Sequence, residues 1–356
     1  MRLGLSQAAY RWVSYPGLRI DLPLYGYRAM PYPYGTSTVG PKELDDNVSW
    51  WLERCQEWNL DSLYMASAWF TDTKRTREVG EMLAANGIEW IGSVSGAWAV
   101  EPAEWARELE SADRQLELFA AGGVRLTAIV NADPPGPPGQ PTPNGGLRFG
   151  HFSREIPMVR QIENLVRNLG DLVRLAGRRK IVLAFENHMD YRISEIVQAV
   201  KGVNSPWLQI NYDFANGYAV VEDQVEAAHL AAPYTVMTHI KDMRVQSIAT
   251  TGEPQFFHAP IGYGNVEIVE ILDILQRNAP NPAKISHCIE TCCLPQYDPQ
   301  LWMKLSIEWL EQHASKYFPQ RFLERVRSAS GPLLVTPSER EEVNAMSASA
   351  KLAVSA

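Results

Sequence analysis

The sequence is short of cysteine and of long apolar runs. Its 356 residues contain four cysteines, and three of them, Cys288, Cys292 and Cys293, crowd one segment without the spaced pairs of a zinc knuckle or a disulfide framework. This usage is typical of a reducing compartment, and no export signal follows Met1, so we expect a cytoplasmic protein. The apolar runs are far shorter than the roughly 20 residues that a membrane-spanning helix needs, so we expect no membrane partner.

Positive charge is scarce as well. The chain has 33 lysines and arginines against 41 aspartates and glutamates, which gives a formal net charge of −8. No summed positive field exists to attract a phosphate backbone, so no nucleic-acid partner is expected. What is present is ordinary globular composition, 46% hydrophobic and 21% charged, with enough apolar material for a large core.

Short runs rich in β-branched and aliphatic residues alternate with longer segments of helical spacing, which is typical of βα units around a parallel sheet. The expected strands cover residues 3–6, 62–66, 90–94, 126–130, 181–187, 208–213, 236–242 and 285–290. The expected helices cover residues 43–58, 75–86, 101–121, 154–176, 194–202, 225–231, 266–278 and 299–312. Eight such units predict a single (β/α)8 barrel, the TIM barrel. An open Rossmann-type sheet is the alternative, but no G-x-G-x-x-G sequence opens a helix.

We divide the chain into a catalytic barrel over residues 1–318 and a helical or flexible tail over residues 319–356. Within the barrel, residues 10–41 form an insertion with six tyrosines, one tryptophan and five prolines. Two further long segments, 132–151 and 244–265, follow the fourth and seventh strands. All three segments follow strands, so they would lie at the C-terminal face of the barrel, where barrel enzymes keep their sites.

Four successive expected strands end in a side chain that can bind a metal: Glu186, Asp213, His239 and Glu290. Neighbouring strands lie about 4.8 Å apart, so these side chains can converge on one ion. A shared cation would also remove the large cost of burying each of them without a partner. The alternative is that each residue separately forms an ion pair or a cap. We predict one divalent ion here; the oxygen-rich set favours Mn²⁺, with Mg²⁺, Co²⁺ or Zn²⁺ as alternatives.

The residues around these ligands resemble the sugar phosphate isomerase/epimerase family of xylose-isomerase-like barrels. Five segments of the C-terminal half carry the resemblance: 185–191 (FENHMDY), 213–217 (DFANG), 239–242 (HIKD), 260–264 (PIGYG) and 289–290 (IE). The resemblance implies a divalent ion on the four predicted ligands that polarises a sugar carbonyl or hydroxyl. It also gives Glu186 and Glu290 catalytic roles as ligands of that ion.

Two departures separate this chain from groups within that superfamily. Ketose 3-epimerases place a histidine three residues after the sixth-strand aspartate, where this chain has Asn216, and the difference weakens an epimerase assignment. DNA-repair endonucleases carry additional histidines for a three-metal site, and the seven histidines here do not follow that pattern. A nuclease activity is therefore not expected.

A metal-bound ketone chemistry needs a base that removes a proton from the neighbouring carbon. His151 follows the fourth-strand loop and is the candidate general base, because an imidazole titrates in the working pH range. The alternative is an exposed loop histidine. His188, two residues beyond Glu186, is assigned to substrate hydroxyls or to the orientation of Glu186.

Other candidates for substrate binding lie at the same mouth. Asn216 is one, and Asp242 is another, with Lys241 beside it. Asp242 would hold a sugar hydroxyl or His239, and the alternative is a simple loop cap. Re-protonation of the deprotonated sugar at another carbon or on the other face gives isomerisation or epimerisation, and loss of a β-substituent gives elimination.

The aromatic insertion favours a substrate with an aromatic part, because Tyr10, Trp12 and their neighbours offer flat apolar walls. Together with His151 this resembles the catalytic subunit of bacterial C-glycoside deglycosidases, which cleave the C–C bond of 3-oxo-C-glycosides by metal-assisted elimination. That resemblance implies a small β-rich second subunit, for which the insertion could serve as the contact; ordinary packing over the barrel is the alternative. A carbohydrate lyase is our first hypothesis, a sugar isomerase or epimerase the second, and a non-catalytic binding barrel the third.

Overall fold

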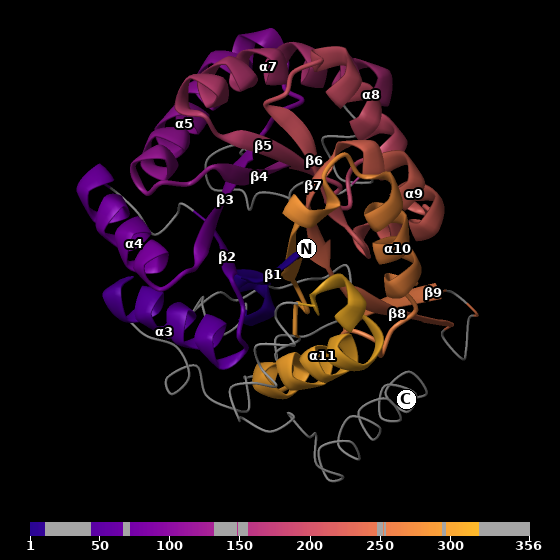
Figure 1. Ribbon diagram of the computed structural model, residues 1–356. Helices are drawn as coiled ribbons and strands as arrows, with labels where there is room; N and C mark the ends of the chain where they lie inside the picture. The colour runs from indigo at the N-terminus through magenta and orange to yellow at the C-terminus, as the bar shows by residue number, and fades with distance from the viewer. Residues whose placement is uncertain are drawn as a thin grey trace.

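Eight parallel strands close into a barrel in a computed structural model that describes residues 1–10, 44–66, 72–131, 148, 156–247, 252, 254–293 and 297–319 (Figure 1). Around the barrel the strands run in chain order, and β1 pairs with β10 to close the ring. The strands are β1 (Arg2–Ser6), β2 (Ser62–Ala66), β3 (Glu89–Gly96), β4 (Leu126–Asn131), β5 (Val182–Glu186), β6 (Leu208–Asp213), β7 (Thr235–Ile240) and β10 (Ser286–Ile289). The predicted (β/α)8 barrel is therefore confirmed, and the open sheet is excluded.

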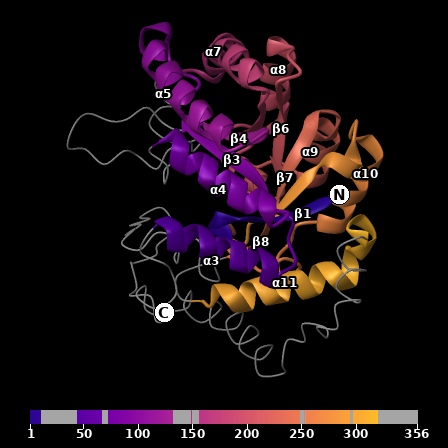
Figure 2. The same cartoon turned by 60° about the vertical axis from the view of Figure 1, so that its left-hand side comes forward.

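The helices form a ring outside the strands (Figures 1 and 2). They are α3 (Leu44–Glu57), α4 (Thr73–Ala85), α5 (Pro102–Ala121), α7 (Met158–Arg179), α8 (Ile193–Val203), α9 (Gln224–Ala231), α10 (Ile268–Asn278) and α11 (Pro299–His313). Short 3₁₀ turns cover Gln7–Tyr10, Asn216–Val220, Ala232–Tyr234, Pro282–Lys284 and Ser315–Tyr317. Gln300 Nε2 of α11 donates to Glu57 Oε1 of α3 at 3.2 Å, which joins these two helices. Within the described residues, every helix is too short or too polar to cross a membrane.

Local sequence explains where several helices begin. Asp72, Asp223 and Asp298 precede α4, α9 and α11, and each carboxylate accepts a hydrogen bond from a backbone N–H in the first turn. These bonds satisfy donors that have no partner inside the helix. Helix α5 begins at Pro102, where the missing N–H costs nothing. The caps hold the helix starts, which lie on the same side of the barrel as the strand ends.

Apolar residues fill two separate volumes. The larger lies between the strands and the helices, where α7 presents Ile162, Leu165, Leu169 and Leu172 at helical spacing. The smaller lies inside the barrel and consists of Tyr64, Ile91, Ala128, Ala184, Met237 and Cys288. Because side chains alternate along a strand, this inner cluster forms a floor beneath the residues at the strand ends.

The segment after the seventh strand contains a hairpin that the sequence analysis did not predict. Strands β8 (Asp242–Ser247) and β9 (Pro254–Ala259) pair antiparallel outside the barrel. The expected strand over residues 236–242 is therefore wrong at its end, since β7 stops at Ile240 and Asp242 opens β8. The signals for a hairpin were present but weak: Gly252 adopts a left-handed φ of 73° near the turn, and a proline opens β9.

Three predictions fall on residues that the structure does not describe. The aromatic insertion lies outside the described residues except for the backbone of Tyr10, which ends the first 3₁₀ turn. The fourth-strand loop lies outside them except for Arg148, and so does the tail after residue 319. The domain boundaries at residues 318 and 319 stay predictions.

Candidate metal centre

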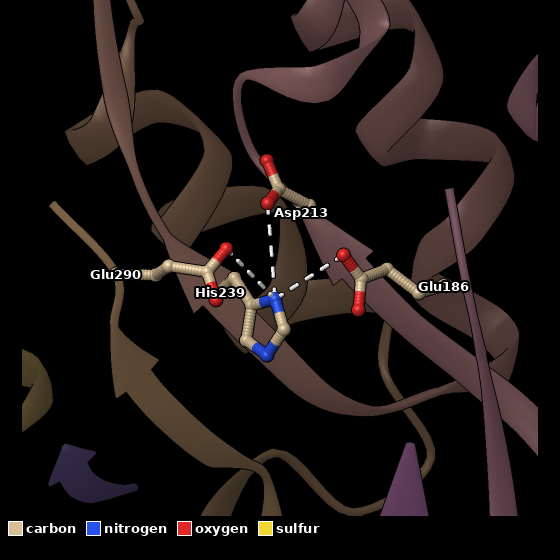
Figure 3. A group of neighbouring side chains, drawn as sticks. All are labelled: Glu186, Asp213, His239 and Glu290. Carbon is tan, nitrogen blue, oxygen red and sulfur yellow. Dashed lines mark ion pairs between the residues drawn. The ribbon is translucent and has the colours of Figure 1, made fainter. Parts of the chain in front are cut away.

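Four side chains that can bind a metal meet at the C-terminal end of the barrel (Figure 3). Glu186 ends β5, Asp213 ends β6, His239 lies in β7 and Glu290 follows β10. Asp213 and His239 are direct partners in the register of β6 and β7. All four side chains are buried, and their ligand atoms lie within 4.8 Å of one another. The structure thus brings together the four residues predicted as ligands.

The geometry of this group fits a divalent ion. His239 Nδ1 lies 3.4 Å from Glu290 Oε2, 3.5 Å from Glu186 Oε1 and 3.7 Å from Asp213 Oδ2. This buried nitrogen makes no hydrogen bond within the described part of the chain. Two atoms bound to one ion at about 2.1 Å are at most about 4.2 Å apart, so the observed spacing needs little rearrangement. The three carboxylates and one imidazole would hold the ion.

Burial and neighbouring charges act in opposite directions on the pKa values of His239 and Glu290. Burial opposes the charged form of His239, but the negative charges of Glu290 and Glu186 raise its pKa well above the ordinary value. Burial likewise opposes the charged form of Glu290, yet the neighbouring His239 and Lys241 lower its pKa below the usual range. Glu290 therefore keeps its charge because cations lie next to it.

Asp213 is held by its own turn and by Asn187. Its Oδ1 accepts hydrogen bonds from the backbone N–H groups of Ala215 at 2.8 Å and Asn216 at 2.9 Å, which leaves Oδ2 facing the other ligands. The Asn187 side chain accepts from the backbone N–H of Asp213 at 2.7 Å and donates to its carbonyl at 3.0 Å. Asn187 thereby fixes the end of β6 against the end of β5.

His239 is contacted by two side chains, Tyr64 from β2 and Asn211 from β6. The ring of Tyr64 lies with its centroid 4.8 Å from the imidazole centroid, and its hydroxyl donates to Ser93 Oγ at 2.8 Å. Asn211 Nδ2 lies 3.3 Å from His239 Nε2 and donates to Glu186 Oε2 at 3.1 Å. Asn211 thus touches two ligands at once. The sequence analysis missed it, although its place two residues before Asp213 puts it on the same face of β6.

Glu290 has partners from β1 and from the residue between β7 and β8. Ser6, the last residue of β1, donates to Glu290 Oε1 at 2.8 Å, and Lys241 Nζ donates to Oε2 at 3.2 Å. The sequence analysis also missed Ser6, because a serine at a strand end carries no chemical signal by itself. Its role follows only from closure of the barrel, which places β1 beside β10.

Asn216, predicted to bind substrate, is fully buried and contacts the ligand set. Its Nδ2 donates to Glu186 Oε1 at 3.4 Å, and its Oδ1 accepts from Lys241 Nζ at 3.0 Å. Both ends of the amide are therefore engaged by the protein, so Asn216 orients Glu186 and Lys241. Direct substrate binding by Asn216 stays a prediction.

Asp242 makes the contacts of a loop cap, and direct substrate binding by Asp242 stays a prediction. Its Oδ2 accepts from the backbone N–H groups of Gly262 at 2.9 Å and Gly264 at 2.8 Å, and its Oδ1 accepts from Val266 at 3.1 Å. Burial raises the pKa of this carboxyl to about 6 despite these donors. The carboxylate holds the end of the hairpin segment, and the contacts of His239 among the described residues are made with other side chains.

His188 lies on the loop after Glu186 and is half-buried, and its Nδ1 makes no hydrogen bond within the described residues. The next residue, Met189, adopts a left-handed φ of 55°, and its carbonyl accepts from the backbone N–H of Arg148 at 2.9 Å. Left-handed backbone at a residue with a side chain is uncommon and concentrates at functional sites. The contact of His188 with substrate stays a prediction.

The remaining site residues cannot be placed. His151 and Trp12 lie outside the described residues, as does the side chain of Tyr10. Their roles as base and as aromatic contacts are therefore still sequence predictions.

Comparisons with known proteins agree with this fold. The family described as xylose isomerase-like TIM barrel matches residues 52–313. No curated protein matches the sequence. The D-psicose 3-epimerase structure from Clostridium cellulolyticum H10, with D-tagatose, is 12% identical with a TM-score of 0.60, and the alignment covers 88% of this chain and 98% of that one.

Two further solved structures are similar. The probable 3-DHS dehydratase from Bacillus anthracis is 11% identical with a TM-score of 0.57, covering 87% of this chain and 99% of that one. A xylose isomerase-like protein from Mycobacterium smegmatis in complex with magnesium is 17% identical with a TM-score of 0.56, covering 86% and 96%. At such identities these likenesses show the fold alone. Because the family match spans more than half of the sequence, the chain belongs to the xylose isomerase-like TIM barrel family.

Proposed function

We propose that this chain is a divalent-metal-dependent carbohydrate enzyme that removes a proton next to a sugar carbonyl. The observation that carries the proposal is the meeting of Glu186, Asp213, His239 and Glu290 in one buried group at the barrel mouth. When bound there, a divalent ion would polarise a substrate carbonyl and stabilise the negative charge that proton removal creates. The oxygen-rich ligand set favours Mn²⁺ as that ion, and magnesium in the similar Mycobacterium smegmatis protein is consistent with a hard divalent cation.

The finer proposal is elimination: cleavage of the C–C bond between sugar and aglycone in a 3-oxo-C-glycoside. The C–H bond next to the carbonyl breaks, a C=C bond forms in the sugar, and the bond to the aglycone breaks. The aglycone carbon takes the electron pair and a proton. Asn216 supports this outcome, because ketose 3-epimerases place a histidine there and the amide of Asn216 is committed to Glu186 and Lys241. The similar dehydratase is named for an elimination as well.

The second candidate is isomerisation or epimerisation of a free sugar. It is favoured by the similarity to D-psicose 3-epimerase and needs the same first step, removal of a proton beside the carbonyl. The third hypothesis, a non-catalytic binding barrel, requires the same ligands to act only in binding.

The residues around the ligands have distinct proposed tasks. His188 would contact a substrate hydroxyl through its ring, since its Nδ1 makes no hydrogen bond to any residue that the structure describes. His151 is proposed as the general base, and Tyr10 and Trp12 as walls for an aromatic aglycone. A small β-rich second subunit that contacts the aromatic insertion remains part of the proposal.

Incubation with an oxidised C-glycoside tests the function. The Mn²⁺-loaded protein should release free aglycone from the 3-oxo compound, and it should leave the matched glycoside with an unoxidised 3-hydroxyl intact, because that substrate has no acidified C–H bond. EDTA should stop the release and added Mn²⁺ should restore it. If sugar isomers form without free aglycone, the lyase hypothesis is wrong and an isomerase is supported. If no sugar is turned over in a metal-dependent way, the non-catalytic binding barrel is the hypothesis that survives.

A further inference from the structure

The side chain of Lys241 is a buried cation inside the ligand group. It is 3% exposed, and its Nζ lies 3.3 Å from Asp213 Oδ2, 3.2 Å from Glu290 Oε2 and 3.0 Å from Asn216 Oδ1. An ammonium has three N–H donors, and these three acceptors use all of them. Lys241 thus has no donor left for a substrate oxygen, which makes it a positioning residue.

Lys241 shares its acceptors with the predicted ion. Asp213 Oδ2 and Glu290 Oε2, which accept from Lys241, are the same oxygens that face His239 Nδ1 at 3.7 and 3.4 Å. A carboxylate oxygen has two lone-pair sites, so each can bind a metal on one side and an ammonium on the other. Both cations can therefore occupy the group together.

Charge balance favours the presence of both cations. Three buried carboxylates with one divalent ion keep one uncompensated negative charge, which is costly away from water. The ammonium of Lys241 neutralises that charge. We propose that Lys241 is a resident cation of the centre, which the divalent ion joins without displacing it, and that its charge weakens the hold on the ion.

This inference rests on the proposed metal centre but on neither the sugar nor the reaction. A resident cation stabilises the carboxylates in metal-free protein, so folding does not depend on metal. It also repels a second cation a few ångströms away, so the ion should exchange readily. If Lys241 served only to shape the ligands, its loss would weaken metal binding instead. The two roles therefore predict opposite changes in Mn²⁺ affinity when Lys241 is replaced.

Calorimetric titration of Lys241 variants with Mn²⁺ distinguishes the two roles. Thermal unfolding in EDTA and in Mn²⁺ provides a second measurement. Lys241→Met, which keeps length without charge, should bind Mn²⁺ at least about tenfold more tightly than wild type. Its melting temperature should fall in EDTA and recover in Mn²⁺, so the metal-induced rise exceeds that of wild type. Lys241→Arg, which keeps the charge, should restore wild-type behaviour. Lys241→Gln removes the charge but keeps polar contacts. If the methionine variant folds poorly, the glutamine variant should show the same tighter Mn²⁺ binding.

Lys316→Met is the matched control, since Lys316 forms an exposed ion pair with Asp273 at 3.2 Å and is 60% exposed. It should bind Mn²⁺ as wild type does. Unchanged or weaker Mn²⁺ binding in both the methionine and glutamine variants of Lys241, with wild type still binding, would overturn this inference alone. Absence of Mn²⁺ binding in wild type would overturn it together with the proposed function.

Discussion

Two layers of side chains inside the barrel differ sharply although they come from the same strands. The upper layer holds the ligands Glu186, Asp213, His239 and Glu290. Two residues earlier on each chain segment, the lower layer holds Ala184, Asn211, Met237 and Cys288, which are all fully buried. Three of these four belong to the apolar floor cluster, and Asn211 is the exception. Residues two apart on a strand point to the same face. On three of these four segments, the earlier residue therefore packs in the apolar floor and the later one can bind a metal.

The difference follows from the partners available at each depth. At the strand ends, loops and neighbouring strands supply donors such as Ser6, Asn216 and Lys241, so carboxylates can be buried there with compensation. One layer deeper the surroundings are other strand side chains, and an unpaired charge would be costly. We therefore expect substitutions in the upper layer to change metal binding and those of the apolar residues in the lower layer to change stability.

The largest effect should come from His239→Ala in the upper layer. Loss of the imidazole should remove bound metal and lower turnover by about 10³-fold or more, because the ion supplies the charge stabilisation of the reaction. Metal content by elemental analysis and turnover of the oxidised glycoside measure this. His239→Asn controls for the cavity left by alanine, and circular dichroism checks folding. A normal metal content in both variants would remove His239 from the ligand set.

Asn211 is the polar member of the lower layer, so its replacement tests whether a residue at that depth can affect metal binding. Because Asn211 touches both Glu186 and His239, Asn211→Leu should lower Mn²⁺ affinity by about 10–100-fold, as is usual when a group that orients metal ligands is lost. Calorimetric titration with Mn²⁺ measures the affinity. Metal binding that stays at the wild-type level would show that Asn211 only fills space.

The matched control comes from the same depth in β7. Met237 is fully buried in the floor cluster, and its side chain makes no polar contact among the described residues. Met237→Leu conserves volume, so it should cost less than about 1.5 kcal/mol of unfolding free energy and leave Mn²⁺ affinity unchanged. A loss of metal affinity as large as that of Asn211→Leu would mean that the two layers do not separate function from packing.

The sequence predicted the metal ligands of the upper layer better than the residues that hydrogen-bond to them and hold them in place. Metal ligands at successive strand ends are visible because a carboxylate or imidazole at the end of an apolar run is costly without a partner. Ser6 and Asn187 give no such signal, since small polar residues are common in loops, and their roles depend on which strands become neighbours. Lys241 was placed at the mouth by its position two residues after His239, but its three acceptors come from separate elements.

The fold was predictable to the level of element order, and the errors lie where tertiary contacts decide. The eight strands and helices follow hydrophobic periodicity, which is a local property of the sequence. The break between β7 and β8 at Lys241 depends on the contacts of Asp242 with three backbone N–H groups about 20 residues later. No periodicity records those contacts, so the strand was extended too far and the hairpin was missed.

Buried acids outside the two layers extend the comparison, and the smallest expected effect concerns Glu222. It accepts hydrogen bonds from the backbone N–H of Ile193, the first residue of α8, at 3.0 and 3.1 Å. Burial raises the pKa of Glu222 from 4.5 to about 7, whereas the cations beside Glu290 lower the pKa of that carboxyl. Glu222 thus shows what burial does to a carboxylate without an adjacent buried cation.

The raised pKa makes stability depend on pH in a definite direction. The folded protein keeps a proton on Glu222 that the unfolded chain has lost, so stability falls as pH rises from about 4.5 to about 7 and stays lower above that range. Glu222→Gln mimics the protonated acid and should lack this fall, a difference of about 1 kcal/mol after allowance for solvent screening. Urea unfolding at pH 5 and pH 8 measures it, and other titrating groups cancel between the two proteins. Equal pH dependence in both would mean that Arg192 and Arg148, which lower the pKa of Glu222, compensate its charge as fully as His239 and Lys241 compensate Glu290.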